Sequence, residues 1–144
     1  MAASRWAVIL CKFADDNAAT LPLSHYQRLF TGAGSGALNM VDFFSDMSHG
    51  HLDLSASQVF GWFTLTLTKA DYAGNLPPPA LPQVNRNGLV DACRQAATNA
   101  SVNLSTFDGV VVSMNGAVDL FGYVGGMAAF CDTGSLSPSP CGGR

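Results

Sequence analysis

The chain has 144 residues, of which 48% are hydrophobic and only 12% are charged, and its formal net charge is −3. This length suits a single domain with a real core and is too short for two ordinary domains. The few Lys and Arg residues form no basic stripe, and no run reaches the ~18 consecutive apolar residues of a membrane span, so we expect neither nucleic acid nor a membrane as a partner.

The first part of the chain predicts a buried strand followed by two helices. Residues 6–13 are almost continuously apolar, which is typical of a strand buried on both faces. Residues 24–30 are expected to form a short helix with Ser24 as its N-cap. Residues 38–48 are expected to form an amphipathic helix that ends at Gly50. The apolar face of that helix consists of Met40, Phe43, Phe44 and Met47.

The rest of the chain predicts more strands and one longer helix. In chain order we expect strands at 51–54 and 58–67, a turn at 69–72, a Pro-rich loop at 75–82, a helix at 87–100, a strand at 107–114 and an edge strand near 126–130. Strands alternating with helices indicate an α/β (α+β) domain with a twisted central sheet and two main helices. We expect this single domain to span residues 1–134 and residues 135–144 to form an irregular C-terminal tail.

The cysteines and the N-terminus bear on redox state and location. Cys11, Cys93, Cys131 and Cys141 allow three pairings, and none has the Cys-x-x-Cys spacing of a zinc site. We expect Cys11 to act as a buried hydrophobe and at most one pair to form a disulfide. The N-terminus runs directly into an apolar strand without a signal-peptide cleavage site, so the sequence as written predicts a cytoplasmic location.

Three separated blocks of the sequence resemble the start of a known catalytic domain. They are Val8-Ile-Leu-Cys-Lys-Phe-Ala-Asp-Asp16, then Val41-Asp-Phe-Phe-Ser-Asp-Met-Ser-His-Gly-His-Leu-Asp-Leu54 with Val59-Phe-Gly-Trp-Phe63, and Phe107-Asp-Gly-Val-Val-Val-Ser-Met-Asn115 with Asp119-Leu-Phe-Gly122. In this order they are similar to the first part of the gametolysin and immune-inhibitor-A type of zinc metallopeptidase, a branch of the metzincins. The pattern extends to about Ser139.

The resemblance implies a truncated metzincin-like domain. In that largely secreted family this region builds the twisted sheet and first helices, and a His-Glu-x-x-His zinc helix follows. This chain turns instead to Pro-Cys-Gly-Gly-Arg144. All ten acidic residues are Asp, so no Glu can act as general base and peptidase activity by the family mechanism is excluded. The sheet face that the zinc helix would cover is expected to stay apolar, which favours a homodimer through that face.

The segment His49-Gly-His-Leu-Asp53 contains residue types and spacings that suit metal ligands, independently of the resemblance. In an extended strand alternate residues share a face, so His49, His51 and Asp53 would point the same way. Two imidazoles and a carboxylate suit Zn²⁺ or a similar divalent transition metal. If His49 still belongs to the preceding helix, Asp46 shares its face and becomes a further ligand or supporting residue. His25 would complete the metal site within the chain or across a dimer.

These residues lead to a functional hypothesis and a rival. The hypothesis is a small metal-dependent hydrolase of low specificity that acts on a small-molecule substrate such as an activated ester or phosphoester. Metal-bound hydroxide would be the nucleophile, and Asp53 or Asp46 would accept the proton. The structural alternative places His49 and His51 at a solvent-facing helix end and strand start without a ligand. The rival function is then a catalytically inactive, self-associating fragment of a zinc metallopeptidase.

Overall fold

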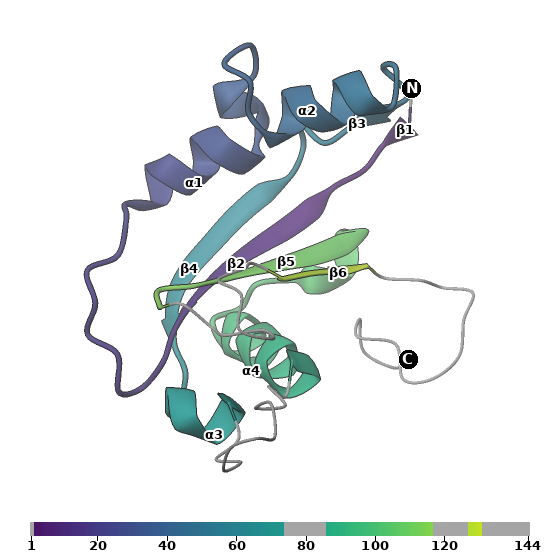
Figure 1. Cartoon of the computed structure of the whole chain (residues 1–144). Coiled ribbons are helices and arrows are strands. Elements are labelled where there is room, and N and C mark those ends of the chain that lie inside the picture. The colour runs from purple at the N-terminus through teal and green to yellow at the C-terminus, as the bar shows by residue number, and fades with distance from the viewer. Residues whose placement is uncertain (1, 74–85, 117–126, 131–144) are drawn as a thin grey trace, which may run out of the picture.

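A four-stranded sheet forms the centre of the molecule (Figure 1). The computed structural model describes residues 2–73, 86–116 and 127–130. The strands are β2 (Trp6–Lys12), β4 (Gln58–Thr64), β5 (Gly109–Met114) and β6 (Met127–Phe130), in the spatial order β4-β2-β5-β6. β4, β2 and β5 are parallel, and β6 is antiparallel to β5. The predicted α/β class is therefore confirmed in general, and the predicted edge strand is β6.

Four α-helices accompany the sheet in the described ranges, where the sequence predicted two main helices. They are α1 (Leu23–Phe30), α2 (Met40–Met47), α3 (Lys69–Ala73) and α4 (Arg86–Asn99). Short 3-10 turns lie at Gly32–Gly34 and Leu104–Thr106. A separate pair of two-residue strands, β1 (Ala2–Ala3) and β3 (Leu52–Asp53), is parallel. None of the described helices is long and apolar enough to cross a membrane.

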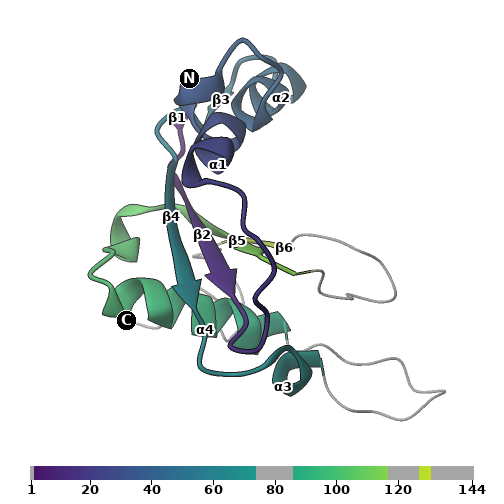
Figure 2. The ribbon, with the colours of Figure 1, turned by 90° about the vertical axis from the view of Figure 1, so that its left-hand side faces the viewer.

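Helices lie on both faces of the sheet, α1 on one and α4 on the other (Figure 2). On the α1 face, Val8, Leu10 and Val59 are buried. The larger cluster lies on the α4 face and contains Ile9, Cys11, Phe13, Leu65, Leu89, Val90, Cys93, Ala97, Val110 and Val112. Alternate residues of β2 therefore enter different clusters, which explains why this strand is apolar throughout. The prediction of a doubly buried strand is confirmed.

A disulfide joins the two layers of the larger cluster. Cys11 of β2 and Cys93 of α4 are bonded, with their Cα atoms 6.2 Å apart and both side chains fully buried. The expectation that Cys11 is buried is confirmed. Cys131, Cys141, the Pro-rich loop 75–82 and the tail 135–144 lie outside the described residues.

β4 is irregular at its midpoint. The pairing of β2 with β4 shifts between Leu10 and Cys11, so Trp62 has no direct partner on β2. Gly61 precedes the shift with a φ of 121°, and a Cβ there would collide with the carbonyl oxygen of Leu10. Only glycine adopts this backbone without strain. The shift lets Trp62 pack in the α1 cluster with Val59, while Phe63 and Leu65 pack in the cluster on the α4 face.

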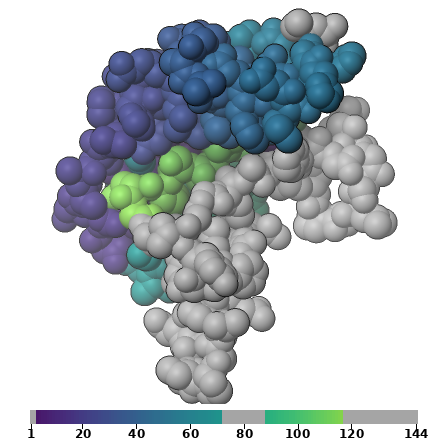
Figure 3. All heavy atoms as spheres, turned by 45° about the horizontal axis from the view of Figure 1, so that its top comes forward, coloured from purple at the N-terminus to yellow at the C-terminus, as the bar shows by residue number. Residues whose placement is uncertain are grey.

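The buried side of α2 differs from the prediction. Val41 is its buried residue, whereas Phe43 is 52% and Met47 68% exposed. The helix packs on β3 and α1, and this contact covers the side that carries Val41 rather than the side of Phe43 and Met47. Periodicity showed an apolar stripe but not which side a neighbour covers. Figure 3 shows the segment from α1 to β3 as a continuous outer layer, with part of β5 reaching the surface beside it.

Of the two predicted helix ends, the N-cap at Ser24 is wrong and the stop at Gly50 is confirmed. Ser24 lies inside α1, and the N-cap is Pro22, which forms no side-chain cap. α2 begins with a complete capping box in which Asn39 accepts the N–H of Asp42 and Asp42 accepts the N–H of Asn39. Gly50 follows the end of α2 with a φ of 76°, as expected for a helix stop.

Candidate binding groove

The structure does not bring the predicted metal ligands together. His49 has a φ of 52°, in the left-handed region, and β3 begins only at Leu52. The segment 49–53 is therefore not one extended strand. The extended backbone that would place His49, His51 and Asp53 on one face is not present in this segment. Both histidine side chains are exposed.

The remaining candidates lie in other local arrangements. The Asp53 carboxylate accepts the N–H of Ser55 at 2.8 Å, and this bond holds the pKa of Asp53 below its ordinary value. Asp46 is exposed on α2, and His25 of α1 contacts the ring of Tyr26 edge-on with centroids 5.3 Å apart. Within residues 2–73, 86–116 and 127–130, no three His, Cys or Asp side chains are placed to hold a metal ion. The described residues therefore present no group of donors for a resident zinc ion.

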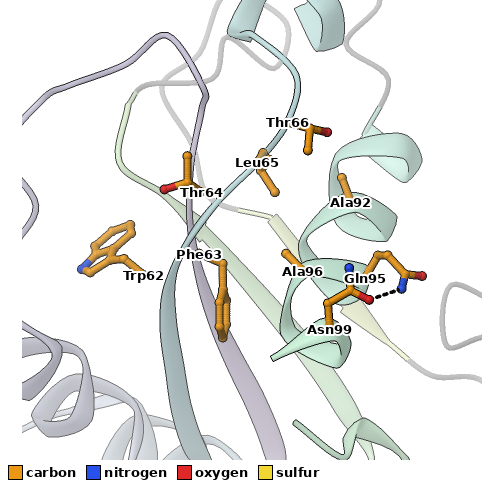
Figure 4. Close-up of a pocket in the computed structure, with 9 residues that line it drawn as sticks. All are labelled: Trp62, Phe63, Thr64, Leu65, Thr66, Ala92, Gln95, Ala96 and Asn99. Atoms are coloured by element: carbon orange, nitrogen blue, oxygen red, sulfur yellow. Dashed lines mark hydrogen bonds between the residues drawn. The ribbon is translucent and has the colours of Figure 1, made fainter. Parts of the chain in front are cut away.

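A groove of about 430 Å³ lies between the end of β4 and α4 (Figure 4). In Figure 4, Trp62 and Thr64 project to one side of the strand and Leu65 projects toward the helix. Ala92 and Ala96 are the small residues of α4 that face the groove. The full lining consists of Trp62, Phe63, Thr64, Leu65, Thr66, Ala92, Gln95, Ala96 and Asn99.

The lining of the groove contains no charged side chain. Its polar groups are hydroxyls and two amides, and Gln95 Nε2 donates to Asn99 Oδ1 at 2.8 Å. Both amides are on exposed residues, so they retain capacity for further hydrogen bonds. The groove therefore suits an uncharged partner with its own donors and acceptors.

The strand that borders the groove is the edge of the sheet. β4 pairs with β2 on one side, and on its other side no strand of the described ranges pairs with it (Figure 2). The N–H of Leu65 donates to the carbonyl of Lys12 at 2.8 Å, toward β2. Because backbone groups alternate sides along an extended strand, the N–H and C=O of Thr64 point away from β2. As far as the described residues go, the outward backbone groups of Thr64 at this edge are available for strand pairing.

Natural edge strands are often protected by charged residues, proline or bulges. The run from residue 58 to residue 67 contains no charged residue and no proline. The irregularity at Trp62 lies at the start of the part of β4 that borders the groove, and Phe63 and Thr64 are the residues of β4 that follow it. Within the described residues, the short edge at Phe63 and Thr64 therefore has no charged residue, proline or covering strand, and in this sense it is unprotected.

Two features of the sequence point to this groove. One is the uncharged, proline-free run itself. The other is the spacing of Ala92, Gln95, Ala96 and Asn99, which share one side of a helix. Ala96 packs against the cluster on the α4 face and also lines the groove, whereas Ala100 is exposed.

No protein-family model and no curated protein matches the chain. The resemblance to gametolysin and immune-inhibitor-A metallopeptidases therefore stays a prediction. So does the homodimer through a face left by a missing zinc helix. The described residues define an α/β domain with an unprotected sheet edge beside an uncharged groove.

Proposed function

We propose that this domain is a protein-binding module that takes up an extended polypeptide segment as an additional strand beside β4. The observation that supports the proposal is the unprotected edge of β4, with Thr64 directing its backbone groups outward. In this mode of recognition main-chain hydrogen bonds supply affinity, and pockets for alternate side chains supply specificity.

The groove supplies the second requirement of strand addition. A volume of about 430 Å³ has room for side chains of an added strand. Ala92 and Ala96 are small, which leaves room beside α4, and the partly buried Phe63 offers apolar contact. Gln95 and Asn99 lie at the exposed rim, where their amides can bond to polar groups of the incoming segment. The uncharged lining favours a segment that is itself uncharged.

This proposal stands in place of metal-dependent hydrolysis. Metal-dependent hydrolysis requires His49, His51 and a third ligand around one ion. The left-handed backbone at His49 and the hydrogen bond that the Asp53 carboxylate accepts from Ser55 do not support that arrangement. Strand addition requires the outward backbone groups of Thr64 and the groove beside them, and the described residues contain both.

A peptide titration tests the proposal. A fluorescent peptide with the sequence of residues 58–67 and a charged solubilising tail is titrated with dilute protein, and its anisotropy is measured. We expect saturable binding, and we expect Ala96→Arg to weaken it at least about tenfold because the long charged side chain enters the groove. Gln27→Arg on the exposed surface of α1 adds the same charge elsewhere and is expected to bind like the unmodified chain.

Two results would contradict the proposal. The first is an anisotropy that does not saturate with the unmodified chain. The second is equal binding by Ala96→Arg and Gln27→Arg, because it would place the peptide outside the groove.

A further inference from the structure

We infer that the strand that docks on β4 is β4 of a second copy of this chain. The inference rests on the proposed function and names its partner. Two copies would join their sheets edge to edge in antiparallel orientation about a two-fold axis. The groove beside β4 would then be part of a homodimer interface.

The backbone of β4 is suited to pairing with itself. A two-fold interface uses the same patch twice, so each donor must meet an acceptor of the same patch. The outward N–H and C=O of Thr64 satisfy this when the axis passes beside that residue. Each Thr64 N–H then donates to the carbonyl of the partner subunit's Thr64, as in a hydrogen-bonded antiparallel pair. The Lys12–Leu65 bond on the inner side of β4 stays intact.

Charge also favours a second copy over a charged partner. No charged residue lies between residues 58 and 67, so two copies meet there without like-charge repulsion. On α4, Arg94 and Asp91 lie 3.4 Å apart and balance each other. No charged residue of β4 therefore adds to the general repulsion between two chains of net charge −3.

The helix beside the groove fits the same symmetry. An axis perpendicular to the joined sheet places both α4 helices on the same face, one on each side of the axis. Ala92 and Ala96 allow a close approach from the partner, and the exposed amides of Gln95 and Asn99 offer hydrogen bonds across the axis. The dimer thus covers the edge strand and the groove together.

The exposed apolar side chains of α2 offer a rival surface. Phe43 and Met47 are more than half exposed, but nothing in the described residues indicates which surface would cover them. They serve as the alternative interface in the test.

Analytical ultracentrifugation of the full chain over a range of concentrations tests the inference. We expect a monomer–dimer equilibrium whose Kd rises at least about tenfold in Thr64→Pro, which removes the outward N–H, and in Ala96→Arg. Thr64→Val, which keeps the backbone donor, and Gln27→Arg are expected to dimerise normally. Circular dichroism establishes that each variant is folded, and Ala96→Arg decides the outcome if Thr64→Pro is not.

Cross-linking gives a second, positional test. Residues opposite each other in a hydrogen-bonded antiparallel pair have Cα atoms about 5.5 Å apart, within the range of a disulfide. Thr64→Cys is therefore expected to form a covalent dimer on a non-reducing gel. Gln58→Cys, at the far end of β4, and the unmodified chain are expected to remain uncross-linked.

The outcomes separate this inference from the proposed function. A chain that stays monomeric but binds the 58–67 peptide in the groove overturns the inference and leaves the proposed function standing. A dimer that persists in Ala96→Arg but dissociates in Phe43→Ser overturns it as well, because the α2 surface then carries the association. A monomer that binds no peptide contradicts both.

Discussion

Asn39 joins the end of α1 to the start of α2 through its side chain. Its side chain is 6% exposed, accepts the N–H of Asp42 at 3.1 Å, and donates to the carbonyls of Arg28 and Thr31, both at 2.9 Å. Asn39→Ala would remove the N-cap and the side-chain donor to the carbonyl of Arg28, while the carbonyl of Thr31 would keep the N–H of Gly34. We expect it to lower the free energy of unfolding by about 2 kcal/mol in urea titrations. Asn17→Ala, at an exposed position, is the control and should change little.

Asp42 makes the stability of the same region depend on pH. The Gly36 N–H donates to both of its carboxylate oxygens, at 2.9 and 2.8 Å, and chiefly this bond holds the pKa of Asp42 below its ordinary value of 3.8. A carboxyl whose pKa is lower in the folded state stabilises the fold above its unfolded pKa and loses that effect as pH falls through the folded pKa. Thermal melts should therefore lose stability at acid pH. Asp42→Asn should be less stable at neutral pH and should lose less on acidification, whereas a loss equal to that of the unmodified chain would assign the effect to other carboxyls.

The histidines allow a direct test of the metal hypothesis at the residue scale. His49 sits in a left-handed turn and His51 is exposed, so we expect neither to hold a metal tightly. The metal content of the purified chain, measured by elemental mass spectrometry, should be the same in His49→Ala/His51→Ala as in the unmodified protein. A stoichiometric zinc ion that disappears in the double variant would contradict this expectation and restore the hydrolase hypothesis.

At the scale of elements, the disulfide between β2 and α4 is the main covalent constraint in the described residues. Cys11 and Cys93 close a loop with a sequence separation of 82 residues. Loop-closure entropy predicts a stabilisation of about 4 kcal/mol for a loop of this size. Reduction, or Cys93→Ala, should lower the free energy of unfolding by up to about that amount in urea titrations.

Chemical labelling checks the same bond. Alkylation of the denatured, unreduced chain should leave Cys11 and Cys93 unmodified, and prior reduction should expose both. Labelling of either residue without reduction would show that the two are free thiols. Such a result would also remove the stability difference expected between oxidised and reduced protein.

At the scale of the whole molecule, the low charge content predicts how association responds to salt. The β4 edge and the groove lining contain no charged residue. Raising the ionic strength from about 0.01 M to about 1 M shortens the Debye length from about 30 Å to about 3 Å, which weakens contacts between exposed charges. We expect the dimer to resist this change in sedimentation experiments. A dimer that dissociates as salt is added would place charged residues in the interface and contradict the β4 pairing.

Much of the architecture could be predicted from the sequence because its signals are local. The apolar run 6–13 predicts β2, and the spacing of Leu89, Val90, Cys93 and Ala97 predicts the buried side of α4. The predicted metal site depends on a local condition that the described residues do not meet. Alternation places His49, His51 and Asp53 on one face only if all of them are extended, and the left-handed backbone at His49 breaks that condition.

The sequence by itself determined the main strands and the helices α1, α2 and α4, since apolar periodicity and helix-stop residues act over a few positions, but it did not predict β1 or the helix α3. Only the tertiary structure decided that β4 is an edge, that Cys11 bonds to Cys93, and that Phe43 faces outward. Each of these depends on contacts between segments far apart in the chain, such as the parallel pairing of β2 with β4. A strand carries the same alternating donors and acceptors in the middle of a sheet and at its edge. Its position, and with it the open groove, becomes defined only when the other strands have taken their places.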